Sequence, residues 1–180
     1  MLAEISLCFL GQPLIRRGTQ DVTTILRRKT RALLAYLALA EQPLTRLTLS
    51  HLFCQESDDP IRSLRWHLSA IRRQVAPELL LTSGETVQLN RENVWLDVAE
   101  FAAALATPLS PQTETILNLY RGEFLAGLDL PDAPEFELWL LGERARLHRL
   151  YEQGLTRWIT PAKACSCKRF WFRFRTIPPI

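Results

Sequence analysis

Hydrophobic and polar residues alternate near the start of the chain, which is the pattern of a half-buried strand. The alternation covers residues 4–9 (Glu-Ile-Ser-Leu-Cys-Phe), and residues 11–13 (Gly-Gln-Pro) break it. Residues 14–15 and 22–26 are two further short strand candidates. The pattern therefore predicts a small antiparallel sheet at the N-terminus.

Beyond this sheet the apolar spacing becomes helical and predicts three helices, over residues 29–41, 46–54 and 60–76. Pro43 ends the first helix and Pro77 ends the third, because proline lacks the backbone N–H that a helix interior needs. Thr45 and Asp59 stand where N-caps are expected, and Pro60 occupies the first position of the third helix.

The third predicted helix has one apolar face and one basic face. Its apolar positions are spaced three and four residues apart, at Ile61, Leu64, Leu68, Ile71 and Val75. The opposite face carries Arg62, Arg65, Trp66, Ser69, Arg72 and Arg73. A basic helix of about 25 Å fits the major groove of DNA, where a guanidinium group can donate to guanine or to phosphate. An amphipathic helix whose arginines only keep it soluble has the same periodicity, so the pattern alone leaves both interpretations open.

A hairpin is predicted after the third helix. Residues 79–89 contain two strand-like runs separated by a turn at Ser83-Gly84-Glu85. A sheet, three helices and a hairpin, with a short helix and turn before the recognition helix, is the element order of a winged-helix DNA-binding domain. As the wing, the hairpin would bring Thr82, Ser83 or Thr86 to a phosphate. A hairpin that only completes the sheet is equally compatible with these residues.

The second half of the chain predicts only helices, over residues 98–106, 112–121 and 135–158. Asp97 is expected to cap the first of them. The last has a predicted core stripe at Leu138, Leu141, Ala145, Leu147, Leu150 and Leu155. Paired helices of this kind resemble tetratricopeptide stacking, which suits protein contacts. The fold class is therefore α+β, with a winged helix at residues 1–95 and a partial helical domain at residues 96–158.

The charge of the chain divides in the same way. Residues 1–76 hold 11 lysines and arginines against 6 acidic residues, whereas residues 77–158 hold 6 against 13. A basic half beside an acidic half indicates that only the first half meets a polyanion. The overall composition, 47% hydrophobic and 23% charged, is ordinary for a soluble globular protein.

The sequence gives little support to an enzyme, a metal site or a membrane protein. It has no glycine-rich phosphate loop and no nucleophile motif, and its three histidines lie in separate predicted helices. Neither His51 with Cys54 nor Cys165 with Cys167 has the further ligands that a metal needs. We therefore expect no catalytic residue, cofactor or metal. No apolar run reaches the roughly 18 residues that a membrane-spanning helix needs. The sequence starts without the pattern of a signal peptide, so we expect a cytoplasmic protein.

Residues 61–73 resemble the recognition helix of the antibiotic-regulatory-protein-type activators of bacteria. That family joins an OmpR-type winged helix to a bacterial transcriptional activator domain. Its pattern Leu-Arg-x-x-Leu-Ser-x-Leu-Arg is met at Leu64, Arg65, Leu68, Ser69, Ile71 and Arg72. Further similar segments follow the order of the family, at residues 31–38, 45–53, 95–101, 120–125 and 136–144.

The resemblance implies a transcriptional activator that binds double-stranded DNA sequence-specifically through the helix at 60–76. We expect base-edge contacts from Arg62, Arg65, Trp66 and Ser69, and phosphate contacts from Arg46, Arg72 and Arg73. The resemblance also implies that the helical part forms a homodimer, orients the winged helix or contacts RNA polymerase. The alternative is a truncated protein-interaction fragment with little or no useful DNA binding.

Residues 159–180 continue neither the helical spacing nor the acidic charge of the preceding part. They contain no acidic residue, and four of the residues at 170–174 are aromatic. The activator domain of the family continues for many more helical residues, so our hypothesis is that the reading frame shifts near residue 159. Resequencing of the locus tests it, because an in-frame stop without helical coding sequence in another frame would contradict it.

Overall fold

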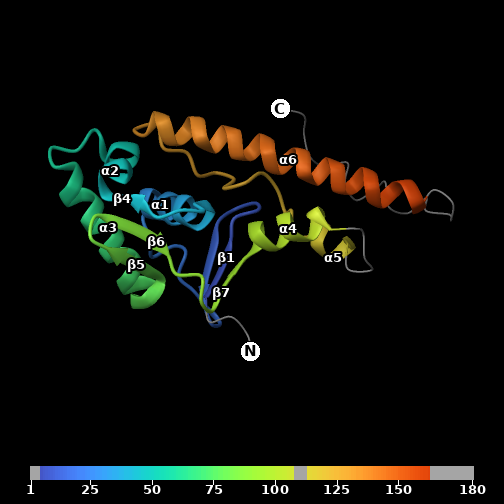
Figure 1. Cartoon of the computed structure of the whole chain (residues 1–180), viewed down its shortest axis with the longest axis horizontal. Helices are drawn as coiled ribbons and strands as arrows, with labels where there is room; N and C mark the ends of the chain where they lie inside the picture. Colours follow the sequence, from blue (N-terminus) through green and yellow to red (C-terminus); the bar gives the residue numbers. More distant parts are fainter. Residues whose placement is uncertain (1–4, 108–112, 163–180) are drawn as a thin grey trace.

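The computed structural model describes residues 5–107 and 113–162 and has the mixed α and β fold that the sequence predicts (Figure 1). Its helices are α1 (Arg28–Leu39), α2 (Arg46–Cys54), α3 (Pro60–Gln74), α4 (Asp97–Ala106), α5 (Thr113–Leu117) and α6 (Pro134–Ala162). Its strands are β1 (Ile5–Cys8), β2 (Leu14–Arg17), β3 (Gln20–Asp21), β4 (Leu44–Thr45), β5 (Leu80–Ser83), β6 (Thr86–Leu89) and β7 (Val94–Leu96). A 3₁₀ turn (Pro77–Leu79) joins α3 to β5.

The first sheet has the strand order β3-β2-β1-β7 and joins segments far apart in the sequence. β1 is antiparallel to β2 but parallel to β7, with Ile5 opposite Val94. The antiparallel pairing predicted at the N-terminus is present from β1 to β3, whereas the parallel strand β7 was not predicted. A parallel pair needs a long crossover connection, which α1, α2, α3 and the β5–β6 hairpin supply here.

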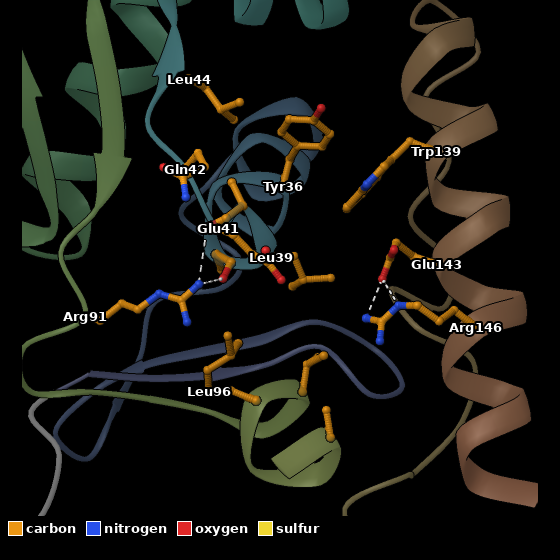
Figure 2. A pocket seen from close by; sticks show the side chains of 15 residues that line it. Tyr36, Leu39, Glu41, Gln42, Leu44, Arg91, Leu96, Trp139, Glu143 and Arg146 are labelled. Atoms are coloured by element: carbon orange, nitrogen blue, oxygen red, sulfur yellow. Dashed lines mark hydrogen bonds and ion pairs between the residues drawn. The ribbon is translucent and has the colours of Figure 1, made fainter. Parts of the chain in front are cut away.

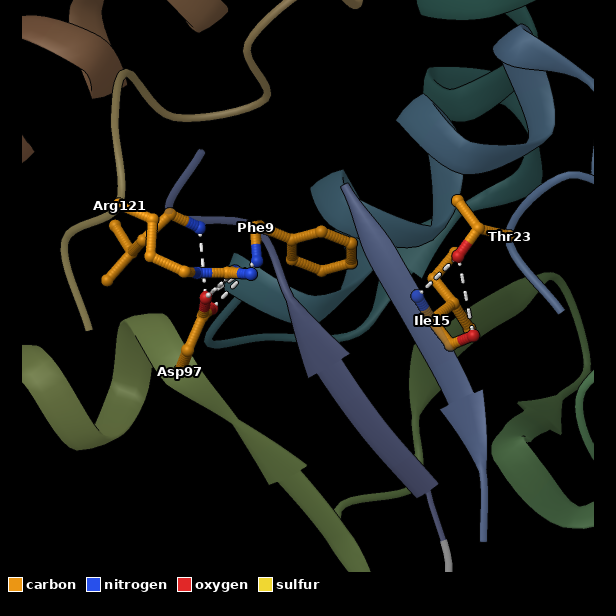
Figure 3. A network of polar contacts seen from close by, with 6 residues as sticks. Phe9, Ile15, Thr23, Asp97 and Arg121 are labelled. Atoms are coloured by element: carbon orange, nitrogen blue, oxygen red, sulfur yellow. Dashed lines mark hydrogen bonds and ion pairs between the residues drawn. The ribbon is translucent and has the colours of Figure 1, made fainter. Parts of the chain in front are cut away.

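Residues 22–26, a predicted strand, form a turn instead. β3 ends at Asp21, whose carboxylate accepts a hydrogen bond from the Thr23 backbone N–H at 2.8 Å. The Thr23 hydroxyl accepts another from the Ile15 N–H at 2.7 Å (Figure 3). The prediction of a strand is wrong because these side chains offer the backbone partners that a neighbouring strand would otherwise supply.

The helices α2 and α3 begin where the sequence places their caps. Thr45 Oγ1 accepts a hydrogen bond from the Thr48 N–H at 3.0 Å, and Asp59 Oδ1 accepts one from the Arg62 N–H at 2.9 Å. β5 and β6 form the predicted hairpin, and β6 also pairs with β4. The predicted order of sheet, three helices and hairpin is therefore present.

α6 lies along the first half of the molecule and extends past it to α4 and α5 (Figure 1). Its buried positions include Phe136, Leu140, Leu147 and Tyr151. Phe136 packs on Phe53 of α2 with ring centroids 5.1 Å apart, and one hydrophobic cluster contains residues of both halves. Leu138 and Leu141 are 73% and 64% exposed, and Ala145 is exposed as well. Their prediction as core residues is wrong, because α6 is apolar on two sides and spacing alone does not identify the buried one.

Asp97 is the first residue of α4 rather than the N-cap that the sequence predicts. Its buried carboxylate accepts hydrogen bonds from the N–H groups of Phe9 at 2.8 Å and Leu10 at 2.9 Å. The Arg121 guanidinium lies 3.3 Å from the same carboxylate (Figure 3). The predicted cap is wrong because Asp97 binds the end of β1 instead, and so joins α4 to the first sheet.

α5 ends at Leu117, before the predicted end at residue 121. The next residues form a loop against the end of β1, where the Leu125 N–H donates to the Phe9 carbonyl at 2.9 Å. α6, by contrast, continues to Ala162, beyond the predicted end at residue 158. Most of the segment to which the reading-frame hypothesis applies, residues 163–180, lies outside the described residues.

Two glycines of α6 have opposite surroundings. A Cβ atom on Gly154 would lie 2.8 Å from Leu105 Cδ2 and 3.0 Å from Leu117 Cδ2, whereas one on Gly142 meets nothing within 4 Å. We expect Gly154→Val to lower the free energy of unfolding by about 1–3 kcal/mol through overpacking. We expect the control Gly142→Ala to raise it by about 0.5–1 kcal/mol, because alanine favours a helix. Urea unfolding measures both, and equal effects would contradict the close packing of α4 and α5 on α6.

Candidate nucleic-acid interface

One face of α3 is buried in the protein and the other is open to solvent. Leu64, Leu68 and Ile71 are fully or almost fully buried, and α3 packs on α1 and α2. The exposed positions of the helix include Arg62, Arg65, Trp66, Ser69 and Arg73. The sequence of α3 contains no acidic residue. The exposed face of α3 is therefore a positively charged surface on a helix that the core holds in place.

Arg72 and Arg46 differ from the other candidates because both are partly buried. The Arg72 guanidinium donates to the Leu80 carbonyl at 3.4 Å, which directs it toward the hairpin strand β5. The Arg46 backbone N–H donates to the Glu85 carbonyl at 2.8 Å, so the start of α2 lies against the hairpin turn. These two arginines thus lie beside the hairpin, away from the centre of the exposed face of α3.

Trp66 has a cationic neighbour that the sequence analysis did not identify. The Arg27 guanidinium lies 4.5 Å from the centre of the Trp66 ring, which is a cation–π contact. Trp66 is 41% exposed despite this cover. Of the adjacent basic residues, Lys29 pairs with Asp132 at 2.5 Å and Arg28 donates to a backbone carbonyl. Arg27 therefore extends the charged surface of α3, and the basic run at residues 27–29 was the signal for it in the sequence.

A buried histidine holds α3 against α1. His67 is 7% exposed, and its Nδ1 lies 2.7 Å from the Thr30 hydroxyl of α1. Burial, together with the nearby charges of Lys29 and Arg27, lowers the pKa of His67 to about 4. The imidazole is therefore neutral at physiological pH, and it fixes the helix that presents Arg65 and Trp66.

The hairpin β5–β6 ends in a turn at Gly84, whose φ of +55° favours glycine. Thr82 and Ser83 are exposed, whereas the partly buried Thr86 donates its hydroxyl proton to the Ser83 carbonyl at 2.9 Å. Of the three candidate wing residues, Thr82 and Ser83 are thus the more accessible.

A cleft of about 700 Å³ lies between α1, α4 and α6 (Figure 2). The Arg91 guanidinium donates to the Ala38 and Ala40 carbonyls at the end of α1, both at 3.2 Å. On the opposite wall the Arg146 guanidinium pairs with Glu143 at 2.6 Å (Figure 2). Both guanidinium groups already have acceptors within the chain. The cleft lies where helices of the two halves of the molecule meet.

Cys8 and Cys54 are free thiols, and burial raises the pKa of each. Among the described residues there is no group of three His, Cys, Asp or Glu side chains that could hold a metal ion. Within residues 5–107 and 113–162, no helix has both the length and the hydropathy needed to cross a membrane.

No family model matches the chain, and no curated protein sequence matches it. Among solved structures, Mycobacterium tuberculosis EmbR, in complex with a low-affinity phosphopeptide, is similar with a TM-score of 0.57 and 19% sequence identity. The similar region covers 81% of this chain and 44% of the EmbR chain, so this chain spans less than half of EmbR. At 19% identity the similarity is evidence for the fold alone. The part of this chain that is covered, 81% of it, therefore has the fold of the corresponding part of EmbR.

Proposed function

We propose that the chain is a sequence-specific, double-stranded DNA-binding regulator of transcription, of the activator type, with α3 in the major groove. The observation that supports this most is the exposed face of α3, where Arg62, Arg65 and Arg73 project from a helix without acidic residues. The shared fold with EmbR, a regulator of the antibiotic-regulatory type, supports the same conclusion.

We assign base-edge contacts to Arg62, Arg65, Trp66 and Ser69 of this surface, and phosphate contacts to Arg73 and to the two arginines beside the hairpin, Arg46 and Arg72. The positions of Arg46 and Arg72 support the division, because both lie beside the hairpin. Phosphate contacts fix the register of a recognition helix on the duplex. Arg27 joins this set as a further phosphate contact, since its guanidinium covers Trp66 at the edge of the surface.

Replacing Arg65 by alanine should lower affinity for the specific site by about 1–3 kcal/mol and relax specificity at one base pair. The exposed Arg149 of α6 offers a matched control, because Arg149→Ala removes the same charge far along the chain from α3. Fluorescence anisotropy on the specific duplex and on single-base variants measures both effects. Uniform weakening on all duplexes would show instead that Arg65 contacts phosphate.

The proposed function is tested by anisotropy on the upstream DNA of the gene and on a random duplex pool, repeated across salt concentrations. We expect preference for the upstream DNA and a salt slope of roughly 0.9 per phosphate neutralised.

A second candidate function, a protein-interaction fragment, is favoured by the exposed Leu138 and Leu141 of α6. On this alternative the helical part binds a protein partner, and α3 contributes little to DNA binding. Absence of binding at low salt, from protein that circular dichroism shows to be folded, would favour this alternative over the DNA-binding regulator.

A further inference from the structure

The side of α6 that faces away from the core is apolar over the first half of the helix. Leu138 and Leu141 are the two most exposed of the large apolar side chains in the described part of the chain. Gly142 and Ala145 are exposed beside them. With about 3.6 residues per turn, these four positions lie opposite the buried positions of α6, and we call them the outer face of α6.

Packing within the chain does not account for the outer face. The two leucines keep most of their apolar surface in water, so they add little to the stability of a single molecule. Glycine inside a helix is less stable than alanine, and a Cβ atom on Gly142 would meet nothing within 4 Å. A second helix on the outer face would bury both leucines and would use the missing side chain of Gly142 for close approach.

Two opposite charges flank the outer face. Glu135 lies six residues before Leu141, and Arg149 lies seven residues after Gly142. Both side chains are exposed, and neither forms an ion pair with another described residue. In an antiparallel pair of α6 helices centred between Leu141 and Gly142, each Glu135 lies opposite Arg149 of the other copy. A parallel pair would instead bring like charges together, so the charges fit an antiparallel second copy of this chain.

We infer that the outer face of α6 is the contact surface of an antiparallel, two-fold symmetric homodimer. Near the two-fold axis Leu141 meets Leu141 of the other copy, and Gly142 meets Gly142. On either side Leu138 packs on Ala145 of the other copy. One pair of helices buries less than the roughly 1,200–2,000 Å² of a standard interface, so we expect a dissociation constant on the order of 100 µM. At the nanomolar protein concentrations of anisotropy the chain is then monomeric, and Arg149→Ala stays a valid control there.

Sedimentation equilibrium of the full chain without DNA tests the inference, over about 5–500 µM, on either side of this constant. We expect a monomer–dimer equilibrium. Replacing Leu138 and Leu141 together by glutamine should raise the dissociation constant by at least roughly tenfold, because the apolar contact is lost. Leu47→Gln is the matched control, since Leu47 of α2 is a leucine of similar exposure outside the outer face, and it should leave the constant unchanged. Circular dichroism shows whether each variant is folded.

Charge exchange tests the antiparallel register. Glu135→Arg or Arg149→Glu alone should raise the dissociation constant by about five- to thirtyfold, because each symmetric dimer then has two repulsive pairs. The double variant should return it to within about twofold of the wild-type value, since both pairs are attractive again.

Three results would overturn the inference. A monomer at every concentration would leave the outer face to a different protein, as in the second candidate function. A dimer that survives the double leucine replacement would place the contact elsewhere on the chain, and failure of the double charge exchange to restore it would exclude the antiparallel register. The measurement contains no DNA, so its result is separate from success or failure of the proposed function.

Discussion

Replacing Asp97 by alanine is expected to lower the free energy of unfolding by about 2–6 kcal/mol, because two buried backbone N–H groups lose their acceptor at about 1–3 kcal/mol each. Asp97 is 1% exposed, and its carboxylate accepts from the N–H groups of Phe9 and Leu10, two residues without exposed surface. In the variant both N–H groups stay buried without an acceptor, and Arg121 loses its ion pair. A domain of this kind has about 5–15 kcal/mol of stability, so much of the folded population should be lost on warming.

Asp97→Asn is the matched variant, because its amide oxygen can still accept from the Phe9 and Leu10 N–H groups, which share Oδ2, while the charge is gone. Urea unfolding of both variants at neutral pH should place Asp97→Asn between the wild type and Asp97→Ala. If alanine cost less than 1 kcal/mol, the connection between β1 and α4 would not depend on this carboxylate.

Lowering the pH from 7 to 4 should remove about 3 kcal/mol of stability through His67 alone. Burial lowers the pKa of His67 in the folded protein to about 4, against a value of 6.5 for the free side chain. Between these values the unfolded chain binds a proton that the folded protein does not, so stability rises with pH over this window. Urea unfolding at intervals from pH 4 to pH 7.5 measures the slope.

The variant His67→Phe isolates this contribution, because phenylalanine fills the buried position without titrating. The difference between wild type and variant should grow with pH from about 4 to 6.5 and then stay constant. The comparison with His67→Phe is needed because Asp97 also contributes to the pH dependence of stability. Burial raises the pKa of Asp97, so its ionisation lowers stability as pH rises. His51 and His148 are exposed and present in both proteins. An unchanged slope in His67→Phe would show that the imidazole is solvated and does not hold α3 against α1.

The parts of the fold that the sequence predicted are those determined by near neighbours in the chain. Thr45 and Asp59 cap helices three residues ahead of the N–H groups that they bind, so their positions were visible in the sequence. β7 was not predicted because its three residues pair with a strand at the far end of the domain. The role of Asp97 was not predicted for the same reason, since its partner Phe9 lies 88 residues away in the sequence.

In the candidate site, too, the features that depend on near neighbours in the chain were predicted and those that depend on distant residues were not. The exposure of Arg62, Arg65 and Ser69 follows from helical spacing alone, because the opposite positions are apolar. The partial burial of Arg72 depends on where β5 lies, and the contact of Arg27 with Trp66 depends on how α1 crosses α3. No periodicity within one helix predicts contacts between two elements.

The parallel pairing of β1 with β7 has a consequence for the order in which the chain folds. During synthesis β1 emerges first, yet its partner at Val94 and its acceptor at Asp97 emerge only after α1, α2, α3 and the hairpin. Contacts of such long sequence separation form slowly, because the entropy of closing the loop is lost before they are gained. Until then, β1 has an edge with unsatisfied N–H and carbonyl groups, which can pair with another chain. We therefore expect nascent chains that stop before β7 to be the species that aggregates.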